Sequence, residues 1–128
     1  MAAFEDDFTA FLQADAAITA VVGGRISPDF GQAASVPKIH YEIIDDEPAN
    51  SLDGWTNGLS RVLVQVNIYA RSYQTCIEVE RLLITRFATP PAQFSITIKR
   101  KGLTDFELDT KLHRRIIEIS CGHHDFLN

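Results

Sequence analysis

The strongest constraint on the fold is a stretch in which apolar and mixed side chains alternate one by one. The apolar positions are Val62, Val64, Val66, Ile68 and Ala70. The positions between them are Arg61, Leu63, Gln65, Asn67 and Tyr69. Successive side chains of a β-strand point to opposite faces, so this alternation predicts a strand over residues 60–70 with one face in the core. The mixed face is left for solvent or for a partner.

Helical patterns lie on both sides of this strand. The spacing of apolar residues predicts a helix around residues 4–12 and another over 73–88, with Ser72 as the N-cap of the second. A short helix is expected over residues 15–21, because Asp15 is a good N-cap and a pair of glycines follows.

Alternation also predicts strands over residues 38–45, 94–99 and 112–121, with a turn at Gly102. The order is then helix, strand, strand, helix, strand, strand. A chain of 128 residues makes one domain, residues 1–128. We expect an α+β fold with a mainly antiparallel four-stranded sheet and helices packed on one face.

Charge is distributed unevenly along the chain. Residues 1–60 carry ten acids against two bases, whereas residues 61–128 carry seven acids against ten bases. The net charge of −5 argues against a protein that coats nucleic acid, because that affinity comes from neutralised phosphates. One interpretation is a scattered, solvated surface; the other is an acidic face that meets a basic face on the next copy, head to tail.

A long acidic loop is expected at about residues 45–60, between two predicted strands. It contains Asp45, Asp46, Glu47 and Asp53, and it also holds the single tryptophan, Trp55. Loops of this length in small domains are usually functional or disordered. The acids either are solvated or form a site, and Trp55 either folds back on its own domain or anchors an interface.

No motif in the sequence predicts catalysis or a bound cofactor. The pair of glycines at residues 23–24 is not a phosphate-binding fingerprint. His123, His124 and Asp125 are adjacent, and adjacent residues seldom converge on one metal ion, so a solvated C-terminus is favoured. A triad of His113, Asp109 and a serine lacks a nucleophile elbow. The thiols Cys76 and Cys121 are expected to be small buried side chains. No apolar run approaches the ~20 residues that span a bilayer, so no membrane partner is expected.

Several segments resemble those of a known protein family in their residues and in their order along the chain. These segments are residues 15–18, 21–26, 36–41, 51–54 and 61–70, with His113, Arg114 and Arg115 in the last predicted strand. The pattern resembles the tail-terminator, or tail-completion, family of long-tailed phages and gene transfer agents. The resemblance covers nearly the whole chain.

The resemblance implies a structural virion protein without catalytic residues or cofactors. Such proteins form hexameric rings of identical subunits that cap the tail tube protein and meet neck proteins such as stoppers or adaptors. It implies assembly in the bacterial cytoplasm and a final place at the tail–neck junction, with DNA only passing through the lumen. Interface or lumen positions are then expected at Asp45, Asp46, Glu47, Asp53, Trp55 and Arg71. Acids that line a lumen would repel passing DNA rather than hold it.

Two alternatives remain open at this point. The closer one is another head–tail neck or completion protein. The more distant one is a small-ligand-binding α+β domain, for which a dry pocket with a few convergent polar groups would be expected.

Overall fold

The computed structural model describes residues 3–28, 36–48, 59–92 and 94–124. The elements, in chain order, are α1 (Ala3–Gln13), α2 (Ala16–Val22), β1 (Ile26–Ser27), β2 (Lys38–Pro48), β3 (Leu59–Ala70), α3 (Tyr73–Phe87), β4 (Phe94–Glu107) and β5 (Leu112–His124). None of the helices in these ranges is long and apolar enough to cross a membrane.

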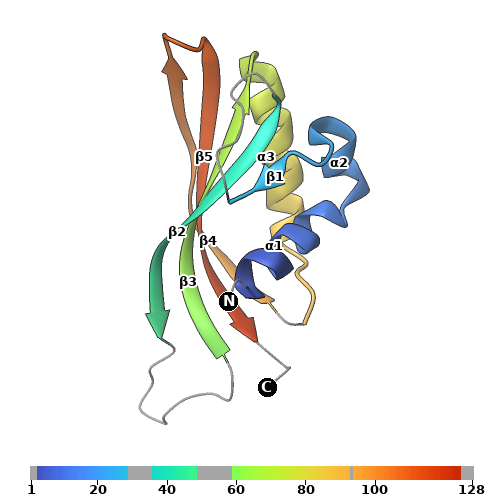
Figure 1. Ribbon diagram of the computed structural model, residues 1–128, viewed down its shortest axis with the longest axis vertical. Coiled ribbons are helices and arrows are strands. Elements are labelled where there is room, and N and C mark those ends of the chain that lie inside the picture. Colours follow the sequence, from blue (N-terminus) through green and yellow to red (C-terminus); the bar gives the residue numbers. More distant parts are fainter. Residues whose placement is uncertain (1–2, 29–35, 49–58, 93, 125–128) are drawn as a thin grey trace.

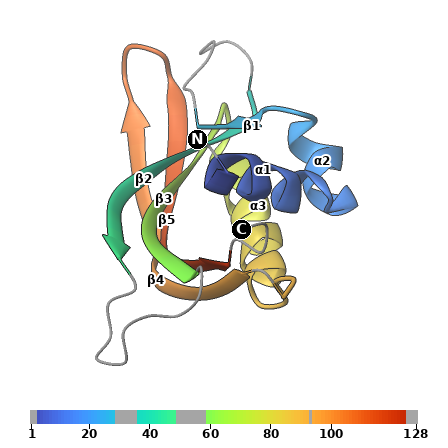
Figure 2. The same ribbon diagram turned by 60° about the horizontal axis from the view of Figure 1, so that its bottom comes forward.

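One sheet and one layer of helices make up the described fold (Figure 1). The strand order is β1-β2-β3-β5-β4, and only the β1–β2 pair is parallel. The three helices cover one face, and the view in Figure 2 shows how strongly the sheet twists behind them. The α+β prediction is confirmed, although the sheet has five strands rather than four. The additional strand, β1, is two residues long and pairs Ile26 with Ile39, which is too short to give a periodic pattern.

The core forms between the helices and the apolar face of β3. All five apolar positions predicted to face inward on this strand are buried: Val62, Val64, Val66, Ile68 and Ala70. Rings from α1, α3 and two strands pack against one another around Phe8, which meets Tyr41 at 4.9 Å and Phe87 at 6.3 Å between ring centroids. The Tyr41 hydroxyl donates to the Glu5 carbonyl at 2.8 Å, and burial raises the pKa of Tyr41 to about 12.

Both predicted N-caps are confirmed. The Asp15 carboxylate accepts hydrogen bonds from the backbone N–H groups of Ala17 and Ile18, at 2.9 and 3.2 Å. The Ser72 hydroxyl accepts from the Thr75 N–H at 3.1 Å. These oxygens satisfy donors that have no partner inside the first turn of a helix.

The predicted end of the first long strand is wrong. Strand β2 continues past Asp45 to Pro48 and pairs with β3 as far as Ser60. The segment between the strands is therefore 49–58 rather than 45–60, and it lies outside the described residues. Acidic residues are depleted in strands, and pairing with β3 overrides that preference here. A bulge between Ile43 and Asp45 accompanies the extension.

The hairpin formed by β4 and β5 is longer than predicted. Gly102 is not a turn: it lies inside β4, and the chain reverses only at residues 108–111. Strand β5 likewise runs past Cys121 to His124. The charged run Lys99–Lys101 breaks the apolar alternation of β4, which is why the sequence pattern places the end of the strand too early.

Candidate assembly surfaces

The predicted site residues do not form one cluster. Asp45, Asp46 and Glu47 lie on β2, opposite Leu63, Val62 and Arg61 of β3. Arg71 is exposed just after the other end of β3. At ~3.3 Å per residue, it lies roughly 30 Å along the strand from Val62. Asp53 and Trp55 are outside the described residues.

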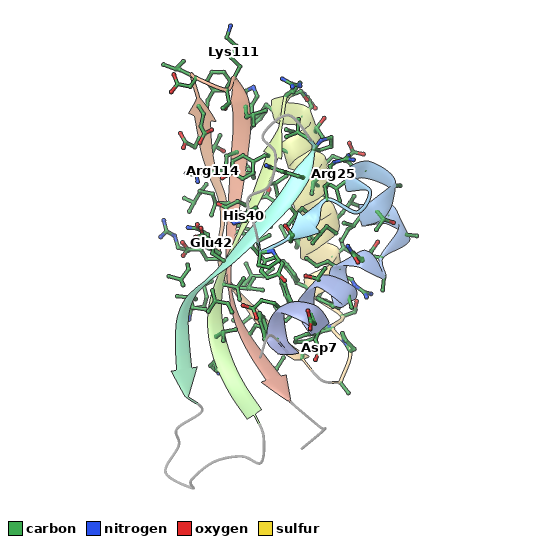
Figure 3. The ribbon with its side chains drawn as sticks, in the orientation of Figure 1. Asp7, Arg25, His40, Glu42, Lys111 and Arg114 are labelled. Carbon is green, nitrogen blue, oxygen red and sulfur yellow. The ribbon has the colours of Figure 1, made fainter. Side chains whose placement is uncertain are left out.

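The distal part of β2 is an edge of the sheet. β1 pairs only with Ile39 and His40, so within the described ranges no strand lies beside β2 from Glu42 onward. We call Glu42, Asp45, Asp46 and Glu47, which follow one another along this part of β2, the acidic edge. Glu42 is exposed and points away from the helices (Figure 3). It forms no ion pair with any residue that the structure describes.

The opposite edge of the sheet is basic. Lys99, Arg100 and Lys101 are exposed neighbours on β4, the strand at the other end of the strand order, and we call them the basic edge. Arg100 approaches Glu118 only to 3.8 Å, and its side chain is 59% exposed. Neither lysine has an ion-pair partner in the described part of the chain.

Bulges shape the basic edge. The register between β4 and β5 shifts between Ile98 and Arg100, and again between Arg100 and Leu103. Extra residues on one strand of a pair bend that strand and leave some backbone groups unpaired. Gly102 takes up part of the distortion with φ +80°, a conformation that side-chain-bearing residues rarely adopt.

A buried ion pair holds these bulges against α3. Arg115 Nη2 lies 3.1 Å from Glu80 Oε1, and the other carboxylate oxygen accepts from the Gly102 N–H at 2.9 Å. Arg115 Nη1 also donates to Thr104 Oγ1 at 2.7 Å and to the Tyr73 hydroxyl at 3.3 Å. The hydrogen bond to Glu80 raises the pKa of Arg115 above its ordinary value. One helix residue thus fixes both the bulged strand and its neighbour.

A third surface lies at the turn between β4 and β5. Leu108 is 79% exposed and Phe106 is 43% exposed, and the Phe106 ring lies 4.7 Å from the His113 ring. We call Phe106 and Leu108 the apolar tip. At 79% exposure the Leu108 side chain adds little to the stability of the domain, so the tip is a candidate surface for contact with another molecule. The tip was not predicted from the sequence, although Leu108 stands alone among polar residues there.

A shallow groove lies between α1 and the start of β4, and Arg86, which lines it, has a role in the packing of the domain. Arg86 covers the Phe11 ring at 4.5 Å and donates to the Phe11 carbonyl at 3.1 and 2.9 Å. That carbonyl belongs to the last turn of α1, where a cation is favourable. Arg86 therefore acts as a clamp between helices.

The residues considered for chemistry are dispersed. Cys76 and Cys121 are buried free thiols, as predicted, and burial raises their pKa values to about 11 and about 12. Such thiols stay protonated near neutral pH and are poor nucleophiles. In the ranges that the structure describes, no group of three His, Cys, Asp or Glu side chains is placed to bind a metal. His123 and His124 end β5, and Asp125 lies outside those ranges.

A comparison with curated proteins finds no match. The family model described as Tail completion protein gp17 matches residues 7–122. The matched range begins in α1 and ends in β5, so it contains the acidic edge, the basic edge and the apolar tip. The chain therefore belongs to this family of phage tail completion proteins.

Proposed function

We propose that this tail completion protein forms a ring that ends the tail tube and joins the tail to the capsid neck. This proposal is supported by two different surfaces that lie at opposite ends of the long axis of the domain. The apolar tip is at the β4–β5 turn, and the acidic end of β2 is at the other end (Figure 1). A ring subunit between a tube and a neck needs two such ends, one for each neighbour.

The proposed role is structural and places the protein in the virion, at the tail–neck junction, after assembly in the bacterial cytoplasm. Membership of the tail completion family supports this role. The partners in the proposal are further copies of the chain, the tail tube protein and a neck protein. DNA passes through the lumen and is not a bound ligand.

The remaining site predictions belong to this proposal. Asp53, Trp55 and Arg71 are proposed interface or lumen positions. If Trp55 anchors an interface, Trp55→Ala should lose ring assembly or neck joining while the domain stays folded. Retention of both activities would exclude Trp55 as an anchor.

Electron microscopy of purified protein mixed with tail tubes tests this proposal directly. A ring at one end of each tube is expected, together with tubes that no longer elongate when more tube protein is added. Binding along the sides of the tubes, or no binding at all, would contradict the proposal.

A point variant then tests the apolar tip. Leu108→Ser should leave the melting temperature unchanged because the side chain is 79% exposed. It should nevertheless weaken attachment to the tube or to the neck about tenfold or more, as expected for an anchor in an interface. Lys111→Ala, in the same turn, is the matched control and should keep attachment.

A further inference from the structure

Three of the four large apolar side chains that are exposed in the described ranges gather at one end of the molecule. They are Leu108 and Phe106 of the apolar tip and Tyr73, which is 45% exposed at the start of α3. The fourth, Ile44, lies on β2. The centroid of the His113 ring lies 4.7 Å from that of Phe106 and 6.2 Å from that of Tyr73. In Figure 1 the β4–β5 turn and the start of α3 lie at the same end, and we call the apolar tip together with Tyr73 the end patch.

The turn that carries most of this patch is held in one shape by its own hydrogen bonds. The Lys111 N–H donates to the Glu107 carbonyl at 2.8 Å, and the Thr110 hydroxyl donates to the Glu107 carboxylate at 3.0 Å. Directly after the turn, Leu112 is buried, so the base of the hairpin is part of the packed domain. A surface that is ordered before binding loses little conformational entropy on binding, which favours a tight contact.

The end patch is too small to hold two copies of this chain together by itself. Large side chains of this kind present roughly 150–250 Å² each when fully exposed, so the three exposed fractions add up to about 350 Å². Two such patches in contact would bury about 700 Å², whereas a specific interface buries at least about 1,000 Å². The area therefore favours a contact in which the end patch is one part of a larger interface with another protein.

The shape of this end indicates what the partner must offer. The tip projects from the end of a two-stranded hairpin, so it is convex (Figure 1). A projecting apolar side chain contributes most to binding when it fills a pocket from which water is excluded. The matching site is therefore a socket, by which we mean a concave apolar site on the partner.

The open end of a tail tube is the surface that fits this description best. A tube that elongates by addition of tube protein exposes, at its open end, the surface that the next layer would cover. Permanent interfaces of this kind are more apolar than transient ones. A protein that ends the tube has to cover the same surface.

We propose that Leu108 inserts into an apolar socket at the open end of the tail tube, with Phe106 and Tyr73 packed around it. This inference rests on the proposed function and names the chemistry of one of its contacts. Because burial of apolar surface drives the contact, attachment to tubes should change less than about threefold between low and high sodium chloride.

Two substitutions of Leu108 distinguish a socket from a flat apolar contact. Leu108→Met keeps the volume and the apolar character, so attachment to purified tail tubes should stay within about threefold of the unmodified protein. Leu108→Trp overfills a socket and should weaken attachment about tenfold or more. A flat contact would instead gain from the larger apolar area. Co-sedimentation with tubes measures attachment, and the melting temperature of both variants should stay unchanged because the side chain is exposed.

The other exposed apolar positions supply the controls. Ile44→Trp introduces the same side chain on β2, away from the end patch, and should attach normally. Tyr73→Ala should weaken attachment by less than about fivefold, as expected for a side chain beside the main anchor. Tyr73→Phe removes only the hydroxyl that accepts from Arg115 and should attach like the unmodified protein.

The outcomes separate this inference from the proposed function. If the unmodified protein does not attach to tubes, both fail. If it attaches and Leu108→Trp attaches equally well or better, the socket is refuted and the function stands. If Leu108→Trp still ends tubes but no longer joins them to tailless capsids, the tip belongs to the neck contact, and the inference fails alone. A tenfold loss of attachment at high salt would show that charges rather than apolar side chains carry the contact, which also overturns the inference.

Discussion

Arg114 and Arg115 are neighbours on β5, yet their side chains lie in different environments. Arg115 lies on the helix side, where its side chain is 15% exposed and Glu80 pairs with it at 3.1 Å. Arg114 lies on the opposite face (Figure 3), where its side chain is 28% exposed and Asp105, itself 49% exposed, pairs with it at 3.1 Å. The two ion pairs have the same length but contribute differently to stability. Removing the partner of a buried charge costs far more free energy of unfolding than removing the partner of a more exposed charge. The strand thus places one arginine between α3 and the sheet and the other on the sheet face that has no helices.

The largest difference should appear when Glu80 is removed. Glu80→Ala leaves Arg115 without its anion and the Gly102 N–H without its acceptor. We expect a loss of about 3 kcal/mol in the free energy of unfolding, near the low end for buried pairs because Arg115 keeps some solvent contact. Urea denaturation measures this loss. Glu78→Ala, an exposed position on the same helix, should change stability by less than about 0.5 kcal/mol. Equal effects of the two substitutions would refute the structural role of the buried pair.

A smaller effect is expected at the bulge that this pair supports. Gly102→Ala forces a side-chain-bearing residue to adopt φ +80°, which should cost about 1–2 kcal/mol. The new Cβ would lie 3.5 Å from Arg115 Nη2, an ordinary contact, so the backbone rather than a clash sets the cost.

Gly24→Ala is the matched control for the bulge. A Cβ at Gly24 meets nothing within 4 Å. We therefore expect no loss of stability there by thermal denaturation. If Gly102→Ala proves equally harmless, the bulge is not strained and the basic edge is held by other contacts.

The smallest effect should follow loss of the exposed pair. Asp105→Ala removes the carboxylate that pairs with Arg114, and the loss in the free energy of unfolding should be less than about 1 kcal/mol and smaller still at high salt. Denaturation in low and high salt measures both quantities. If Asp105→Ala lowers the free energy of unfolding as much as Glu80→Ala does, the two arginines do not differ in their contribution to stability.

The elements with strong periodicity could be predicted from the sequence. The alternation in residues 60–70 located the central strand, and Asp15 and Ser72 located two helix starts. The ends of the hairpins could not be located in this way, because they depend on pairing with a neighbour. Acids at the end of β2 and bases in the middle of β4 have the composition of loops, and only the adjacent strands keep them extended.

The candidate site was only partly predictable for the same reason. The acids of β2 were identified from their charge, whereas Glu80 and Arg115 are far apart in sequence and meet only through the packing of α3 on the sheet. One signal was present: Arg115 occupies the inward side of β5 in line with Ile117 and Ile119. A cation at such a position requires a buried anion, and the sequence alone does not say which one.

The twist of the sheet has a consequence for the directions in which its two edges face. Adjacent strands in a sheet are rotated by roughly 20–25° relative to one another, so β2 and β4, which lie three strand steps apart, run in directions that differ by about 60–75°. A molecule that contacts β2 and a molecule that contacts β4 are therefore held at a fixed angle to each other by the backbone of one domain.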